Sequence, residues 1–128
     1  MRILVCLTAA ALLMAGAAAA QTSARTVEVD LWNFKFDPDA LTLQAGQPYV
    51  LHLVNQSDSR HDFTAKAFFA AARIAEQDRG AVVDGKVDLA PNSSRDIHLT
   101  APPAGSFEAR CSKFLHAHLG MKAAIVVR

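Results

Sequence analysis

The chain has 128 residues, and its 13 Lys and Arg residues nearly balance its 12 Asp and Glu residues, which gives a net charge of +1. This length suits one domain of ordinary size. We do not expect nucleic acid as a partner, because the sequence carries no basic stripe with interleaved aromatic residues.

Residues 1–20 have the features of a secretory signal peptide. A basic start at Arg2 is followed by an almost wholly apolar run, which ends in the small-residue pattern Ala18-Ala19-Ala20. A membrane span is the alternative, but the Ala-rich second half of the run is weakly apolar. We therefore expect a cleaved signal at 1–20 and a monomeric, periplasmic domain at 21–128, with no membrane anchor after cleavage.

Alternating apolar and polar residues predict short strands along the mature chain. In the first half, these segments are 26–31, 34–36, 41–43, 49–54 and 61–65. The apolar phase shifts between the first two segments, so we expect a bulge or bend near Leu31 and Trp32, with Trp32 packed or shielding a sheet edge. Residues 55–60 are wholly polar and predict a loop, which places His61 where a loop enters a strand.

The second half contains the one expected helix. Apolar residues recur at helical spacing over 67–77, and Gly80 can end the segment, which predicts about three turns. Asp84-Gly85 predicts a tight hairpin turn. Further strands are expected at 95–100, 106–110 and 122–127. Seven or eight short strands with turn signals between them predict an all-β fold, a Greek-key β-sandwich or barrel with one inserted short helix.

The stretch from Cys111 to Met121 concentrates the chemistry. It holds a thiol, two imidazoles (His116 and His118) and a thioether within eleven residues, on an expected loop between two strands. Such ligands favour copper or zinc over magnesium or calcium. Cys6 leaves with the signal, so Cys111 is left unpaired in an oxidising compartment, where a metal would make use of it. An inert buried thiol is the alternative.

Two motifs of the chain resemble those of the cupredoxins, the family of plastocyanin- and azurin-like copper proteins. One runs from Trp32-Asn33-Phe34-Lys35-Phe36-Asp37-Pro38 and Leu41-Thr42-Leu43-Gln44-Ala45-Gly46 through Asn55 to His61-Asp62-Phe63. The other is Cys-x4-His-x4-Met at Cys111, His116 and Met121, with Gly120 before the methionine. The resemblance implies one type 1 copper ion with three ligands in a plane and a weak axial one. They are His61, Cys111 and His116 in the plane, with Met121 on the axis.

The sequence departs from the family pattern at Asp62, where many cupredoxins carry an asparagine whose amide ties the two ligand loops together. Asp62 can still accept a hydrogen bond from the Ser112 hydroxyl, but we expect its negative charge to favour Cu(II) and to lower the reduction potential. His118 is a second departure, because it competes with His116 as a ligand. The motif spacing favours His116.

These ligands predict a periplasmic electron-transfer protein rather than an enzyme, because no open coordination position or acid–base pair is evident. The set suits both Cu(II) and Cu(I), whereas a structural zinc site normally has four strong ligands. Redox proteins are the expected partners, docking on an apolar patch of Leu115, Ala117 and Leu119. The alternatives are a periplasmic copper carrier or buffer with the same fold, a metal-free binding module, and a zinc hydrolase with a His2Cys site.

Overall fold

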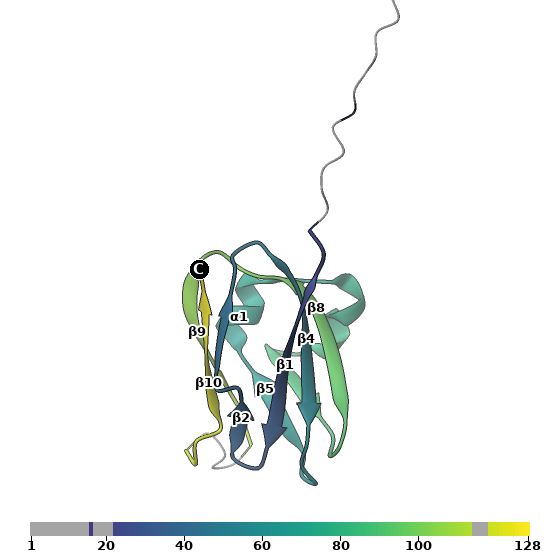
Figure 1. The fold of residues 1–128 in the computed structure, drawn as a ribbon. Coiled ribbons are helices and arrows are strands. Elements are labelled where there is room, and N and C mark those ends of the chain that lie inside the picture. Colours follow the sequence, from purple (N-terminus) through teal and green to yellow (C-terminus); the bar gives the residue numbers. More distant parts are fainter. Residues whose placement is uncertain (1–15, 17–21, 114–117) are drawn as a thin grey trace, which may run out of the picture.

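Two five-stranded β-sheets pack face to face in the computed structural model, which describes residue 16 and residues 22–113 and 118–128 (Figure 1). The described elements are ten strands, one short α-helix and one 3-10 helix. Among these residues, no helix is long and apolar enough to span a membrane.

The first sheet has the strand order β2-β1-β4-β8-β6. Its strands are β1 (Arg25–Trp32), β2 (Lys35–Asp37), β4 (Pro48–Asn55), β6 (Arg73–Ile74) and β8 (Ser94–Thr100). The long strands β1 and β4 pair in parallel, with Val29 opposite Leu53. Both side chains are fully buried, so this row of the sheet faces the core.

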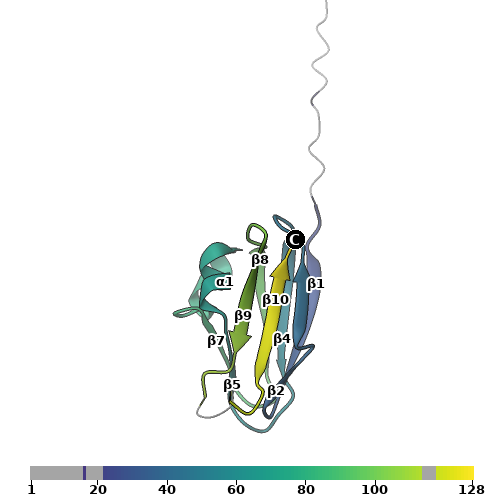
Figure 2. The ribbon, with the colours of Figure 1, turned by 90° about the vertical axis from the view of Figure 1, so that its left-hand side faces the viewer.

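The second sheet has the strand order β3-β10-β9-β5-β7. Its strands are β3 (Ala40–Leu43), β5 (His61–Thr64), β7 (Lys86–Leu89), β9 (Gly105–Arg110) and β10 (Lys122–Val127). The neighbours β9 and β10 lie side by side in Figure 2. Phe63 of β5 is at the centre of the core, where its ring packs edge to face against Phe36 and Phe69, with centroids 5.5 and 6.1 Å away.

The predicted all-β sandwich is confirmed, although the described residues form ten strands rather than seven or eight. The sequence hides some of them because they are very short. The two-residue strand β6 is too brief to show a period of two.

The predicted hairpin turn at Asp84-Gly85 is present. Val83 pairs with Lys86 across these two residues, whose φ values are 53° and 71°. A Cβ added at Gly85 would lie 2.6 Å from Lys66 Cα, so the turn needs glycine both for its backbone conformation and for the close approach of the backbone at Lys66.

The prediction of one three-turn helix over 67–77 is wrong. The helix α1 ends after six residues (Lys66–Ala71), and the chain then forms β6 and the 3-10 helix η1 (Glu76–Ala81). Ala72 is extended, with φ −76° and ψ 158°, and Ile74 pairs with β8. Pairing with the sheet therefore overrides the helix propensity of the alanine-rich segment.

At the expected bulge or bend near Leu31 and Trp32, the chain reverses fully in a hairpin turn. Trp32 pairs with Lys35, so the chain reverses at the two residues between them, and Phe34 has a φ of 66°. The apolar phase shifts because the two halves belong to different strands. Trp32 is 39% exposed and flanks the edge strand β2 rather than packing in the core.

Several connections gather at one end of the sandwich, opposite the C-terminus (Figure 1). They are the β1–β2 turn, the β4–β5 loop, the end of β9 and the start of β10. Because His61 begins β5, and Cys111 and Met121 flank β9 and β10, the fold brings these three predicted ligands to the same end.

Candidate metal centre

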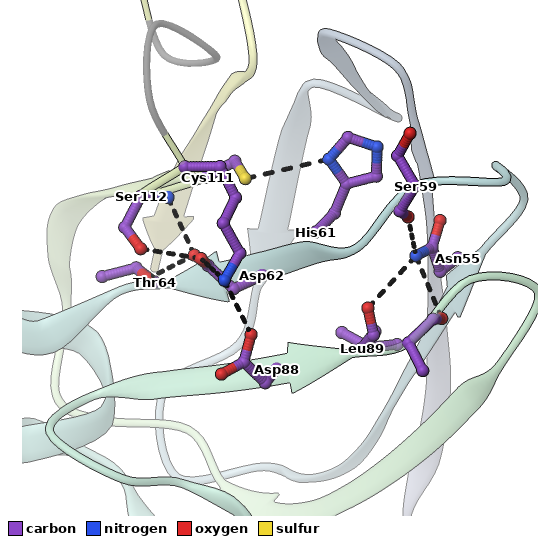
Figure 3. Close-up of polar contacts among 11 residues, drawn as sticks. Asn55, Ser59, His61, Asp62, Thr64, Asp88, Leu89, Cys111 and Ser112 are labelled. Carbon is purple, nitrogen blue, oxygen red and sulfur yellow. Dashed lines mark hydrogen bonds and ion pairs between the residues drawn. The ribbon is translucent and has the colours of Figure 1, made fainter.

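The buried amide of Asn55 fixes the loop that leads to His61. Its nitrogen donates to the carbonyl oxygens of Ser59 at 2.8 Å and Leu89 at 3.2 Å (Figure 3). Its oxygen accepts hydrogen bonds from the backbone N–H and the hydroxyl of Ser57, at 3.0 and 2.9 Å. These hydrogen bonds fix the polar loop internally and attach it to β7, so His61 begins β5 at a defined position.

The imidazole of His61 is fully buried and held by both nitrogens. Nε2 lies 3.1 Å from Asn33 Oδ1, and Nδ1 lies 3.9 Å from Cys111 Sγ. An amide oxygen only accepts hydrogen bonds, so Nε2 carries the proton and the lone pair of Nδ1 faces the sulfur (Figure 3). Metal-binding imidazoles are commonly oriented by such a partner on the other nitrogen.

The two ends of the Cys111–Met121 loop are joined at its base. The backbone N–H of Cys111 donates to the carbonyl oxygen of Met121 at 3.2 Å, directly beyond the β9–β10 ladder. Cys111 is 1% exposed and Met121 is 0% exposed. The thiol and the thioether are therefore both held in the interior by the sheet.

The thiol of Cys111 has a raised pKa. Burial is the main cause, and the negative charge of Asp62 raises the pKa further, whereas hydrogen bonds from the backbone of Asp62 and Lys113 and the positive charge of Lys113 lower it. The metal-free thiol therefore retains its proton at neutral pH, and a metal ion must displace that proton to bind.

Asp62 bridges the two ligand segments. Its Oδ1 accepts from the backbone N–H of Ser112 at 2.9 Å and from the Thr64 hydroxyl at 2.6 Å, and its Oδ2 accepts from the Ser112 hydroxyl at 2.7 Å (Figure 3). The carboxylate thus makes the hydrogen bond to Ser112 that the sequence suggested, and it adds two more.

The sequence matches the model of one protein family over almost its whole length. The sequence model of the cupredoxin-like domain matches residues 4–127. The chain belongs to the cupredoxin family. A comparison with curated proteins found no match.

Three solved structures illustrate the cupredoxin fold of this chain. Auracyanin B has a TM-score of 0.63 at 21% identity, with 86% of this chain and 93% of that chain covered. Auracyanin A, described as a blue copper protein from the green thermophilic photosynthetic bacterium Chloroflexus aurantiacus, has a TM-score of 0.61 at 19% identity, with 83% and 100% covered. A multi-copper oxidase from Pseudomonas thermotolerans has a TM-score of 0.62 at 19% identity, with 82% of this chain and 30% of that chain covered.

The predicted ligands of this cupredoxin are only partly described by the structure. His116 lies outside the described residues, as do Leu115 and Ala117 of the predicted patch. His118 is exposed, and Leu119 is 58% exposed. Within 16, 22–113 and 118–128, no three His, Cys, Asp or Glu residues form a group that could hold a metal ion.

Two other histidines of the cupredoxin are on the first sheet, as expected for strand residues. His52 of β4 bonds to Asp96, and His98 of β8 bonds to Asp78 at 2.8 Å. Sequence reasoning did not find the roles of Asn33 or Asn55, because an isolated asparagine in a turn or at a strand end carries no signal of a distant partner.

The described donors of this cupredoxin fit a copper ion. First-row metals bond to imidazole nitrogen at about 2.0–2.1 Å and to thiolate sulfur at about 2.3 Å, as zinc does. The sum of these two bond lengths exceeds the 3.9 Å between His61 Nδ1 and Cys111 Sγ, so one ion can bond to both atoms. An imidazole and a thiolate, with the buried thioether of Met121 at the end of the same loop, match the preferences of copper better than those of zinc.

Proposed function

We propose that the protein is a periplasmic type 1 copper protein that passes single electrons between redox partners. The observation that carries this proposal is the placement of His61 Nδ1 3.9 Å from Cys111 Sγ, with the imidazole oriented through Asn33. The proposed ligands are His61, Cys111 and Met121, together with His116. The proposal includes no catalysis.

The protein would contribute rigidity and exclusion of water to the proposed reaction. Bound copper would supply a one-electron couple between Cu(II) and Cu(I). His61, Cys111 and Met121 are each at most 1% exposed. Hydrogen bonds of Asn55 and Asp62 hold the segments of His61 and Cys111, and the backbone bond from Cys111 to Met121 holds the other end of the loop. Ligands held in this way move little when the charge of the site changes, which favours fast electron transfer.

We propose that redox partners dock at the end of the sandwich that carries the site. Leu119 is the described member of the predicted apolar patch and is 58% exposed. The backbone oxygen of Phe34 lies 3.6 Å from the position of a Cβ on Gly120, so the β1–β2 turn lies against the end of the ligand loop. The exposed side chains of Phe34 and Trp32 would extend the apolar surface there.

Copper titration of the metal-free protein tests the proposed function. One equivalent of Cu(II) should produce an intense blue or green colour, because the thiolate donates charge to the metal. Cys111→Ser should remain folded and bind copper weakly and without that colour. A colourless wild-type complex, or a Cys111→Ser variant that keeps the intense band, would rule out the proposed centre.

A second measurement separates an electron shuttle from a copper carrier. A shuttle should keep its copper through repeated oxidation and reduction in the presence of a competing chelator. Rapid loss of the ion to the chelator would favour the carrier.

A further inference from the structure

The buried side chain of Asp62 carries a charge that an asparagine would not. Its hydrogen-bond partners among the described residues are all donors, namely the N–H and hydroxyl of Ser112 and the hydroxyl of Thr64, so it acts toward them only as an acceptor, as an ionised carboxylate does. The side chain is fully buried. A buried charge is strongly unfavourable unless an opposite charge accompanies it.

A second carboxylate lies opposite Asp62 on the neighbouring strand. β5 and β7 pair so that Asp62 faces Asp88, and like charges in this position destabilise a sheet. Lys113 Nζ lies 3.3 Å from Asp88 Oδ1 and 3.9 Å from Asp62 Oδ2. The one ammonium group therefore forms ion pairs with both carboxylates and holds the start of the ligand loop against β5 and β7.

The same two charges are close to the thiol of Cys111. Lys113 follows it by two residues, and Asp62 bonds to the intervening Ser112. Negative charge near a metal favours the ion of higher charge, and positive charge has the opposite effect. The charge of Lys113 therefore opposes the decrease in the copper reduction potential that is expected from Asp62.

We propose that Lys113 is a positioning residue that offsets the charge of Asp62 beside the metal centre and anchors the start of the ligand loop. The inference rests on the proposed function. It explains how this chain can carry a carboxylate at a position where many cupredoxins carry an amide.

Reduction potentials of four copper-loaded variants test the offset. Lys113→Met should lower the potential, Asp62→Asn should raise it, and the double variant should return close to the wild-type value. Lys122→Met is the matched control, because Lys122 is an exposed lysine directly after Met121 and should give a smaller shift than Lys113→Met. An unchanged potential in Lys113→Met, or an equal shift in the control, would overturn the proposal.

Urea unfolding of the metal-free proteins tests the ion pair without copper. Lys113→Met should lower the unfolding midpoint clearly in the wild-type background, where it leaves Asp62 buried and facing Asp88. The same substitution should lower the midpoint much less in the Asp62→Asn background. An equal loss in both backgrounds would overturn the pairing. A wild-type protein that stays colourless with Cu(II) would instead reject the proposed function, and this comparison would still decide the role of Lys113.

Discussion

The imidazole of His61 and the amide of Asn33 are 28 residues apart in the chain but share a hydrogen bond of 3.1 Å. The amide oxygen accepts a hydrogen bond from Nε2–H, so the lone pair of Nδ1 is directed at the sulfur of Cys111. The β1–β2 turn, which looks like an ordinary surface turn, therefore selects the tautomer that a metal requires.

Replacement of Asn33 should weaken copper binding without unfolding the protein. Asn33→Leu removes the acceptor from an exposed turn position, so the imidazole loses its orientation, and copper affinity should fall about 10–100-fold. Asn33→Asp keeps an acceptor oxygen and serves as the control. Competition titrations with a chelator of known affinity give the result. Equal affinity in the Leu variant would show that the hydrogen bond does not support the ligand.

His116 rather than His118 should bind the metal. His118→Ala should keep the visible spectrum, since His118 is exposed. His116→Gly should lose the spectrum and regain it when imidazole is added, because the small ligand can occupy the position of the missing side chain. Absorption spectra of the two variants decide between the histidines, and the opposite pattern would assign His118 as the ligand.

Met121 should tune the reduction potential rather than retain the ion. Met121→Leu keeps a similar apolar volume in this buried position, so the loop should stay packed. Loss of the sulfur donor destabilises Cu(II) more than Cu(I), so the potential should rise while the colour remains. Met121→Gln introduces a harder oxygen donor and should lower the potential. Voltammetry on the three proteins tests this, and complete loss of copper in the Leu variant would contradict a weak axial role.

Asp78 should stabilise the fold down to acidic pH. Burial raises its pKa, but hydrogen bonds from the backbone N–H and the ring of His98, at 2.7 and 2.8 Å, lower it, and the pKa lies below the ordinary value of 3.8. Since the folded pKa is the lower one, this stabilisation is present above the unfolded value and is lost as the pH falls through the folded value.

The measurement for Asp78 is urea unfolding between pH 7 and pH 2 at constant ionic strength. Asp78→Asn should be less stable than the wild type at neutral pH, and the difference should shrink below about pH 4. A difference that stays constant over the whole range would mean that the charge of Asp78 does not contribute.

Local sequence patterns predicted the sandwich. The two predictions that the structure corrected, the long helix and the bulge or bend, concern segments whose structure depends on contacts with distant parts of the chain. Alternation with a period of two reveals strands that have one buried face, so most of them were found. The helix ends early because Ile74 pairs with β8, and nothing near Ile74 in the sequence indicates that partner. Likewise, the phase shift at Trp32 could signal a bulge or a reversal, and only the pairing with Lys35 distinguishes them.

For the candidate site, the sequence predicted the residues whose side chains can bind a metal. His61, Cys111 and Met121 come to one end of the sandwich, and the hydrogen bond between Ser112 and Asp62 follows from their neighbouring positions at the ligands. The supporting contacts of Asn33 and of Lys113 depend on which turn or strand the fold places nearby, so they could not be inferred from composition or spacing.

The most C-terminal strand, β10, is an interior strand of its sheet. Ile125 pairs with Leu41 of β3 on one side and with Phe107 of β9 on the other. During synthesis, β3 and β9 therefore have no partner in this position until the residues of β10 have emerged, and a truncated chain would expose two unpaired edges that invite aggregation. The pairing of β3 and β9 with β10 is therefore complete only when synthesis has reached Val127.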